Sequence, residues 1–179
     1  MHYVIRFVPN FLSVSRLILA GLFPLSPEKY WILLIIGGGG SDFLDGWIAR
    51  RWKVTSWKGR ILDAIADKLF VLAVLVTFVL SGKITLWVVP AIIARDLMVV
   101  MIAGYTFYFR AWDSFRQTKS RWSGKIATAG QFLLLVVVAI MPVLIRPALI
   151  VSIILSMTAA WDYGTQFVKA LRQRAKTTL

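Results

Sequence analysis

The sequence predicts an all-α integral membrane protein with six transmembrane helices. Of its 179 residues, 59% are hydrophobic and only 16% are charged, and the mean hydropathy is +0.74. Water-soluble proteins of ordinary composition do not have this balance. Apolar runs recur along the whole chain, so one buried core does not account for them. Residues 1–179 are therefore interpreted as a single membrane domain, with no room for a separate soluble domain.

The apolar runs are close to the roughly 20 residues that a hydrocarbon core of about 30 Å requires. The first run is short and ends at Pro24 and Pro27. Residues 2–8, which precede it, alternate polar and apolar side chains and suit a short helix in the membrane interface. Polar stretches at 50–59 and 110–121 separate later runs. The predicted spans run from about Asn10 to Phe23, Tyr30 to Ala49, Ile61 to Leu80, Thr85 to Phe109, Ile126 to Leu144 and Ala148 to Phe167.

The basic residues predict the orientation of these spans. Lysine and arginine number 21 against 8 acidic residues, which gives a net charge of +13. Sixteen of the basic residues lie near the termini and in alternate connections, whereas only Lys29, Lys83 and Arg146 lie in the intervening ones. The positive-inside rule then places both termini in the cytoplasm and requires an even number of spans. This pattern explains the charge without nucleic acid, and it fits a multi-pass protein of the cell inner membrane or of a mitochondrial inner membrane.

Four of the eight acidic residues lie within 26 positions, at the predicted cytoplasmic ends of the second and third spans. Asp42 and Asp45 are three residues apart, and Asp63 and Asp67 are four apart, so each pair shares one face of a helix. The polar turn between the two spans makes them antiparallel neighbours whose carboxylates can face one cavity. An ionised carboxylate at bilayer depth costs at least a few kcal/mol unless it is paired or ligated. With no cysteine and one histidine, His2, oxygen ligands remain, and they predict a site for Mg²⁺, Mn²⁺ or Ca²⁺.

Residues 42–67 read D-x2-D-G-x2-A-R-x8-G-x3-D-x3-D, which resembles the signature of the CDP-alcohol phosphatidyltransferases. The six predicted spans, the cytoplasmic termini and the chain length also agree with that family. The resemblance implies an enzyme that transfers a phosphatidyl group from CDP-diacylglycerol to an alcohol and releases CMP. It also implies a homodimer. The matching positions are Asp42, Asp45, Gly46, Ala49, Arg50, Gly59, Asp63 and Asp67.

The same resemblance implies a role for each position of the signature. Asp42, Asp45 and Asp63 would hold one or two divalent cations, Mg²⁺ or Mn²⁺, on the diphosphate. Asp67 would complete the metal site and act as the catalytic base on the acceptor hydroxyl. The alternative is that the four aspartates are merely paired with nearby cations. The residues implied in binding the CDP-lipid are Gly46, Ala49, Arg50 and Gly59, and the alternative ion-pair partners are Arg50, Arg60 and Lys68.

Two further stretches resemble the phosphatidylglycerophosphate synthase and cardiolipin synthase branch of the family. Residues 9–16, PNFLSVSR, resemble its P-N-x2-[ST]-x2-R pattern, and residues 123–128, SGKIAT, resemble the start of its fifth span. Phosphatidylglycerophosphate synthases usually carry G-K-x-K-T there, but this chain has Ala127 in place of the second lysine. The missing cation favours phosphatidylglycerol as acceptor, as in cardiolipin synthases, with glycerol 3-phosphate as the alternative.

Basic residues near the fourth connection are the predicted acceptor-binding residues, since either acceptor carries a phosphate. The alternative is that these cations enforce topology and attract anionic lipid. Arg95 and Asp96 are adjacent and are not expected to face each other on a helix, so an active-site role and a structural role both stay open. The predicted acceptor-binding residues are Arg110, Arg116, Lys119, Arg121 and Lys125.

Two other functional classes fit part of the pattern. Six spans with intramembrane carboxylates also describe a small cation transporter or channel. All four clustered aspartates lie towards one side, however, and no similar residues continue a path through the outer half. A noncatalytic relative that only binds nucleotide lipid is the second alternative. Release of CMP in the presence of an alcohol distinguishes the enzyme from both.

Overall fold

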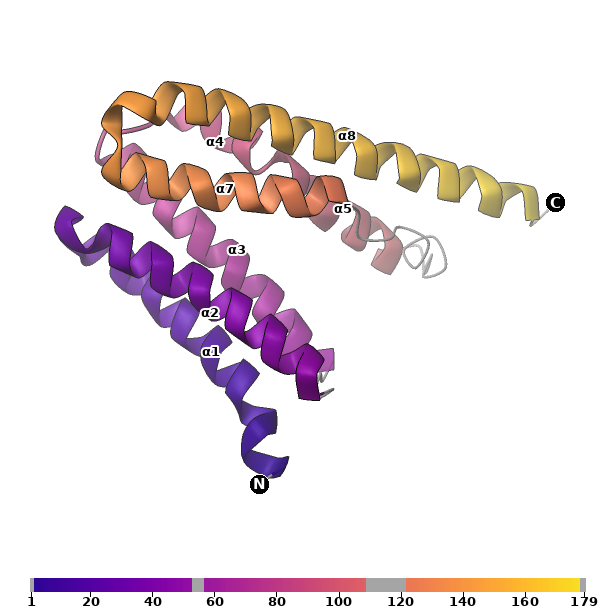
Figure 1. Ribbon diagram of the computed structural model, residues 1–179. Helices are drawn as coiled ribbons and strands as arrows, with labels where there is room; N and C mark the ends of the chain where they lie inside the picture. The colour runs from indigo at the N-terminus through magenta and orange to yellow at the C-terminus, as the bar shows by residue number, and fades with distance from the viewer. Residues whose placement is uncertain (1, 53–56, 109–121, 178–179) are drawn as a thin grey trace. The chain divides into compact units, whose positions relative to one another are not determined.

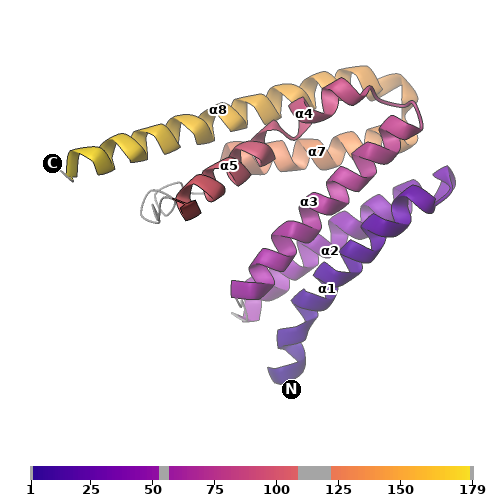
Figure 2. The same cartoon turned by 180° about the vertical axis from the view of Figure 1, so that it is seen from behind.

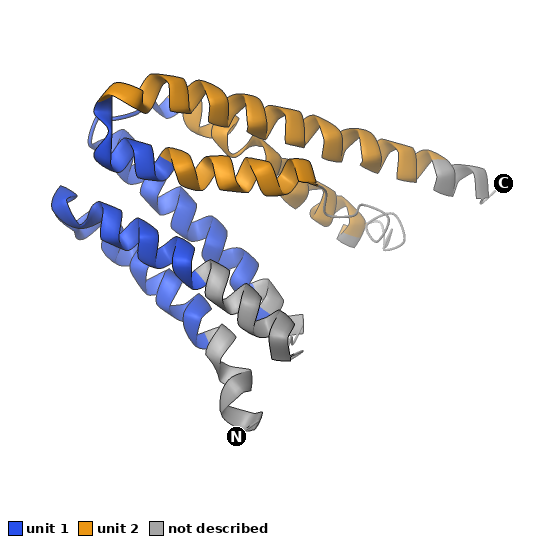
Figure 3. Ribbon diagram, in the orientation of Figure 1, with its two compact units in different colours: residues 1–86, 135–142 blue, residues 87–134, 143–179 orange. Residues whose placement is uncertain are grey.

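The structure is a computed structural model that contains helices and no strand in the part of the chain it describes (Figure 1). The all-α prediction is confirmed for this part. The described backbone covers residues 2–52, 57–108 and 122–177, and the described side chains are those of residues 11–41, 59, 62–106, 108 and 122–172. Two compact units can be distinguished within it (Figure 3).

The first unit is a three-helix assembly in which α1 packs against both α2 and α3. The three helices lie side by side in both views of the ribbon (Figures 1 and 2). The unit contains α1 (His2–Leu22), η1 (Phe23–Leu25), η2 (Glu28–Tyr30), α2 (Trp31–Trp52) and α3 (Trp57–Leu80), together with residues 135–142. Because α1 begins at His2, residues 2–8 are continuous with the helix of the first predicted span and do not form a short helix of their own. Their location in the membrane interface stays a prediction.

Aromatic side chains form the core at one end of this unit. The ring of Phe23 stacks on that of Trp31, with centroids 5.7 Å apart, and meets the rings of Phe70 and Phe78 edge-on at 6.4 and 6.1 Å. Such geometries are the favourable ones for aromatic pairs. The end of α3 is closed nearby by Gly82, whose positive φ of 72° allows the left-handed turn that commonly ends a helix.

One glycine of the four-glycine run in α2 permits close packing with α3. A Cβ added at Gly38 would lie 2.5 Å from Cε1 of Phe70, which no real contact allows, whereas a Cβ added at Gly40 would meet nothing within 4 Å. Gly38 therefore lets the Phe70 ring lie against the helix backbone. Within this run, the close contact with α3 thus depends on Gly38 rather than on Gly40.

The second unit contains the remaining helices. Its longest element, α8, packs along α4 and α5, and the rings of Tyr105 and Phe167 meet edge-on with centroids 5.4 Å apart. The unit comprises residues 87–134 and 143–179. Its elements are most of η3 (Leu86–Val88), α4 (Val89–Ile92), α5 (Ala94–Tyr108), the first part of α7 (Trp122–Ile140), most of η4 (Pro142–Leu144) and α8 (Ile145–Thr177).

The predicted fourth span is broken. Its two pieces, Leu86–Ile92 and Ala94–Thr106, meet at 57°, with Ile93 between them. Ile93 has φ −96° and ψ 10°, outside the helical region. Its own backbone groups still bond to Val89 and Leu97, whereas the N–H of Arg95 bonds to the hydroxyl of Ser156 at 3.2 Å instead of to its own helix. The amide of Gln131 from α7 donates a hydrogen bond of 2.9 Å to the carbonyl oxygen of Ile92. A side chain from a neighbouring helix thus satisfies a backbone group at the break, as a hydrocarbon environment requires.

The length and apolar composition of several helices agree with the prediction of a membrane protein. By length and composition, residues 122–140 and 142–172 can each cross a membrane, and the bent pair makes a third span if it is counted as one. Residues 11–25 form a shorter apolar helix. α3 carries five charged residues in its first half, which are Lys58, Arg60, Asp63, Asp67 and Lys68. The total of six spans remains a prediction.

Candidate active site

The two halves of the signature lie on two neighbouring helices of the first unit. The C-terminal half of α2 carries Asp42 and Asp45, and the N-terminal half of α3 carries Asp63 and Asp67. The two helices are consecutive and lie side by side, which confirms the predicted hairpin (Figures 1 and 2). The described side chains of the signature are those of Asp63 and Asp67, with Gly59 half-buried at the start of α3. The side chains of Asp42, Asp45, Ala49 and Arg50, and the position of Gly46, lie outside the residues described at side-chain level.

Asp63 lies where all three helices of the unit meet. The fully buried Arg16 of α1 donates a hydrogen bond of 3.1 Å from Nη1 to Asp63 Oδ1, and these two groups form an ion pair. Arg16 Nε donates a second bond, of 3.3 Å, to the hydroxyl of Ser41 on α2. The hydroxyl of Ser13 lies 3.5 Å from Asp63 Oδ1. Arg16 therefore joins α1 to the residue that precedes the first signature aspartate and to the third aspartate itself.

Arg16 and Ser41 were not named as site residues from the sequence. The signal was present, because Arg16 is a charged residue inside a predicted span and closes the P-N-x2-[ST]-x2-R pattern. Charged groups in a membrane span almost always face a partner inside the protein. The partner of Arg16 is 47 positions away along the chain, so only the fold reveals it.

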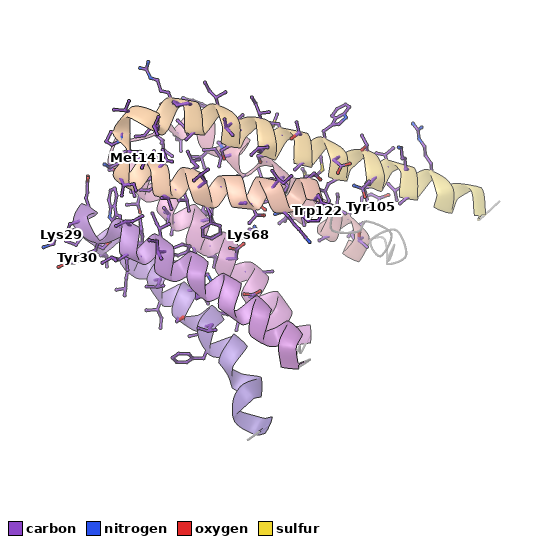
Figure 4. All side chains as sticks on the ribbon, in the orientation of Figure 1. Lys29, Tyr30, Lys68, Tyr105, Trp122 and Met141 are labelled. Carbon is purple, nitrogen blue, oxygen red and sulfur yellow. The ribbon has the colours of Figure 1, made fainter. Side chains whose placement is uncertain are left out.

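Asp67 has one satisfied and one unsatisfied oxygen. Its Oδ2 forms an ion pair of 2.9 Å with Nζ of Lys68, so the pairing suggested for Lys68 is confirmed. Lys68, which lies on α3, is labelled in Figure 4. Its Oδ1 is buried and has no hydrogen-bond partner among the described residues. The side chain as a whole is 13% exposed. An orphan carboxylate oxygen in a buried position is costly, and such a group in a native protein calls for a ligand.

The described carboxylates do not by themselves make a metal centre. No group of three or more histidine, cysteine, aspartate or glutamate side chains gathers in the described part of the chain. Asp42 and Asp45 are needed to complete the predicted set, and their side chains lie outside it. The unsatisfied Oδ1 of Asp67 and the all-oxygen character of the four aspartates both fit a hard divalent cation.

One of the five predicted acceptor-binding residues is described. Lys125 lies exposed in the first turn of α7, with its Nζ 5.0 Å from the ring centroid of Trp122. An exposed ammonium over an aromatic ring is available to an anion. The other four, Arg110, Arg116, Lys119 and Arg121, lie outside the described residues.

The second unit contains a buried polar network around two adjacent residues. Arg95 Nη1 donates a hydrogen bond of 2.9 Å to Asp96 Oδ1, so the prediction that these side chains do not face each other was wrong. Neighbours on a helix point in different directions, but the long arginine stem in the first turn of α5 folds back far enough to reach the carboxylate. Asp96 Oδ2 accepts a bond of 3.0 Å from Gln131 Nε2, the amide that also bonds to Ile92. This network links the break between α4 and α5 to α7.

Comparison with known proteins agrees with the signature. The sequence pattern of the family described as CDP-alcohol phosphatidyltransferase matches residues 6–162. The chain is 38% identical over 107 residues to a cardiolipin synthase (CMP-forming) of Streptomyces coelicolor, covering 54% of this chain and 50% of that protein. It is 34% identical over 140 residues to a CDP-diacylglycerol–glycerol-3-phosphate 3-phosphatidyltransferase of Haemophilus influenzae, covering 72% of each.

A protein of Sodalis glossinidius with the same enzyme name is 31% identical over 143 residues, covering 72% of this chain and 74% of the relative. The chain thus spans about half the length of the cardiolipin synthase and about three quarters of the two other relatives. Because the matched region covers most of the chain and includes the whole signature, the chain belongs to the CDP-alcohol phosphatidyltransferase family.

Proposed function

We propose that this protein transfers a phosphatidyl group from CDP-diacylglycerol to a glycerol-type alcohol, with release of CMP and in dependence on a divalent cation. Family membership and the names of the relatives support the reaction type. Asp67 supports it most directly, because its buried Oδ1 has no hydrogen-bond partner among the described residues and stands one turn from the paired Asp63. A merely structural carboxylate would have both oxygens satisfied.

A divalent cation, Mg²⁺ or Mn²⁺, would be held by the four aspartates of the signature, Asp42, Asp45, Asp63 and Asp67. When bound, this cation would neutralise the negative charge that develops on the diphosphate as CMP departs. Arg16 would keep Asp63 oriented, because its buried guanidinium occupies one side of that carboxylate. Gly46, Ala49, Arg50 and Gly59 would bind the nucleotide lipid.

The chain's own base in this reaction would be Asp67. Its free Oδ1 would take the proton of the acceptor hydroxyl while the hydroxyl oxygen forms a bond to the phosphatidyl phosphorus. The bond from that phosphorus to the bridging oxygen breaks, and CMP leaves with the electron pair. Lys68, which already pairs with Oδ2, would orient the Asp67 carboxylate and leave Oδ1 open to the acceptor hydroxyl.

Phosphatidylglycerol is the proposed acceptor. Ala127 is buried in α7, so this position offers a methyl group where the resembling pattern has a second lysine. A lipid acceptor is held in the membrane by its own chains and carries one negative charge, so it needs fewer cations than a soluble dianion. Glycerol 3-phosphate is the second candidate, because the relatives named for that acceptor match the chain over 72% of its length.

The proposed setting is the inner membrane, with both termini and the signature on the cytoplasmic side. The distribution of basic residues supports this orientation. A homodimer is also proposed, and it rests on the family resemblance alone.

The test is CMP release by the purified protein in mixed micelles of detergent and CDP-diacylglycerol with Mg²⁺ or Mn²⁺. Phosphatidylglycerol, glycerol 3-phosphate, inositol and serine are offered in parallel, and the lipid products are identified by mass. We expect CMP only when an acceptor is present, and cardiolipin as the main product. Phosphatidylglycerophosphate alone would establish the second candidate. Absence of acceptor-dependent CMP release with every alcohol would contradict the proposed function.

A further inference from the structure

The two carboxylate oxygens of Asp63 have different surroundings. Oδ1 accepts a hydrogen bond of 3.1 Å from Nη1 of Arg16, and the hydroxyl of Ser13 lies 3.5 Å from the same oxygen. Both donors belong to α1, three residues apart, and both side chains are buried. No described residue donates a hydrogen bond to Oδ2, and the Asp63 side chain is 39% exposed. One oxygen of this carboxylate is therefore committed to α1, and the other is open to a ligand.

Asp67 shows the same division one helical turn later. Its Oδ2 pairs with Nζ of Lys68 at 2.9 Å, while its buried Oδ1 has no partner among the described residues. Asp63 and Asp67 are the two signature carboxylates whose side chains the structure describes, and each gives one oxygen to a cationic side chain. With one oxygen left, each can serve a metal only as a monodentate ligand.

The number of available oxygens distinguishes the divalent cations that bind oxygen ligands. Ca²⁺ takes about six to eight oxygens in a flexible arrangement, and it can take two of them from one carboxylate. Mg²⁺ requires a nearly ideal octahedron and is usually bound through one or two carboxylates together with water and phosphate oxygens. Mn²⁺ also suits octahedral sites built from oxygen ligands. Carboxylates that are limited to one oxygen each therefore favour Mg²⁺ or Mn²⁺ and leave Ca²⁺ short of ligands.

The surroundings of Arg16 oppose the rearrangement that Ca²⁺ would require. The guanidinium is fully buried, and its Nε donates a hydrogen bond of 3.3 Å to the hydroxyl of Ser41 on α2. That hydroxyl donates in turn to the carbonyl oxygen of Gly38 at 2.7 Å. Freeing Asp63 Oδ1 for a metal would break an ion pair with a buried guanidinium, and a buried pair is costly to break. Asp63 is thus held in the state that offers one oxygen.

We propose that Arg16 and Lys68 set the metal preference of the signature. Each occupies one oxygen of an aspartate, so that the site accepts Mg²⁺ or Mn²⁺ and discriminates against Ca²⁺. The assignment rests on the proposed function and deepens it, because it names the residues that select the cation. Both are positioning residues, since they act through Asp63 and Asp67. Arg16 imposes the stronger restriction, because it is fully buried whereas the Lys68 side chain is 36% exposed.

The test measures cation binding by the purified full-length protein in detergent, with neither CDP-diacylglycerol nor an acceptor present. Binding of Mn²⁺ is followed by the loss of the electron paramagnetic resonance signal of free Mn²⁺, and Mg²⁺ and Ca²⁺ are titrated as competitors. The variants are Arg16→Gln, Arg16→Lys and Lys68→Gln. Lys83→Gln is the matched control, because it removes one positive charge from an ion pair with Glu28 that lies outside the signature.

We expect the unmodified protein to bind Mn²⁺ and Mg²⁺ more tightly than Ca²⁺. Arg16→Gln should lower the ratio of the Ca²⁺ Kd to the Mn²⁺ Kd by about tenfold or more, because Asp63 then offers both oxygens. Lys68→Gln should lower the ratio less, and Lys83→Gln should leave it unchanged. Arg16→Lys should retain part of the preference, since an ammonium can still pair with Oδ1. A merely structural role would change the affinities for all three cations by a similar factor and leave their ratio unchanged.

The outcomes separate this assignment from the proposed reaction. Equal affinities of the unmodified protein for Ca²⁺ and Mn²⁺, or an unchanged ratio in both Arg16→Gln and Lys68→Gln, would overturn the assignment while acceptor-dependent CMP release still supports the reaction. If Arg16→Gln does not fold, Lys68→Gln decides, because that side chain is partly exposed. Absence of Mn²⁺ binding would contradict the assignment and the metal-dependent function together. A lowered ratio in a protein that releases no CMP would support the assignment and contradict the reaction.

Discussion

The Arg16–Asp63 pair shows how one buried charge can organise a membrane site. Arg16 is fully buried and bonds to residues of both α2 and α3, while Asp63 is 39% exposed and can still meet a ligand. The desolvation of such a pair roughly cancels its attraction, so it is a poor source of stability by itself. Its value lies in orientation, because removing Arg16 leaves the Asp63 carboxylate without its ion-pair partner.

We predict that Arg16→Met lowers the free energy of unfolding by about 3 kcal/mol, the lower end for a broken buried pair because Asp63 is partly exposed. Arg16→Met combined with Asp63→Leu should restore most of that stability without restoring CMP release. The comparison pair is Lys83–Glu28, which is more exposed, and Lys83→Met should cost about 1 kcal/mol or less. The measurement is unfolding in detergent together with turnover. Activity at the level of the unmodified protein in the double variant would show that Asp63 is not a ligand.

Substitution of Asp67 and substitution of Asp63 should have different effects on turnover and on binding of the CDP-lipid. If Asp67 is chiefly the base, Asp67→Asn abolishes turnover while Mn²⁺-dependent binding of CDP-diacylglycerol persists, since the amide cannot take the proton. Asp63→Asn should lose both, because it removes a charged ligand. Binding is measured by equilibrium filtration with labelled CDP-lipid, and Glu28→Gln serves as a control far from the signature in sequence. Equal loss of binding in the two aspartate variants would make Asp67 a metal ligand rather than the base.

Sequence spacing predicted the residues of the signature but only some of their contacts. The intervals between Asp63 and Asp67 placed them on one helix, and the adjacent Lys68 was a visible partner for Asp67. The link from Asp63 to Arg16 depends on how α1 packs, which spacing does not encode. The Arg95–Asp96 contact depends on a side-chain rotamer at a helix start, so helical geometry alone gave the wrong answer.

At the scale of the elements, the break between α4 and α5 depends on Gln131. Its amide donates to Ile92 O and to Asp96 Oδ2, and the side chain is buried. We predict that Gln131→Leu destabilises the protein by about 1–3 kcal/mol, because two buried acceptors lose their donor. Thr158→Val is the matched control, since that exposed hydroxyl bonds only to carbonyls of its own helix. Equal unfolding midpoints for the two variants would show that the break does not need this support.

The glycines of α2 offer a second pair of matched substitutions. Gly38→Ala should destabilise the α2–α3 contact by about 1–3 kcal/mol, because its methyl group would collide with the Phe70 ring. Gly40→Ala meets open space and should be neutral or stabilising by up to about 1 kcal/mol. Adding Phe70→Leu to Gly38→Ala should recover part of the loss. Thermal unfolding is measured for the unmodified protein, the two glycine variants and the double variant. A similar loss of stability in both glycine variants would refute the packing role.

The sequence predicted where most of these helices lie, but it did not predict their detailed contacts or the bend between α4 and α5. Hydrophobic runs identify a helix by its composition, so α2, α3, α7 and α8 lie near the predicted spans. A run cannot show which of four consecutive glycines meets an aromatic ring. Nor could it locate the bend at Ile93, since Pro90 lies within a continuous apolar stretch and the compensating donor comes from another helix.

For the whole molecule, the charges of the signature explain why hydropathy does not identify α3 as a span. α7 and α8 are apolar enough to be recognised as spans, and α3 is interrupted by the charged residues around Asp63. Carboxylates inside a membrane span usually serve function, and they lower the mean hydropathy by which spans are recognised. The positive-inside pattern does not depend on hydropathy, and it therefore provides a separate test of the six-span prediction.

Labelling of single cysteines tests the orientation directly, because the native chain contains no cysteine. Cysteines introduced at Thr55 and Ser114 lie in cation-rich connections, so an impermeant thiol reagent should reach them only after the cells are permeabilised. Lys29→Cys and Thr85→Cys lie at exposed positions in cation-poor connections and should react in intact cells. Gly82 is avoided, because its positive φ would strain any other residue. The reverse labelling pattern would place the signature outside, away from cytoplasmic CDP-diacylglycerol, and the proposed reaction could not proceed there.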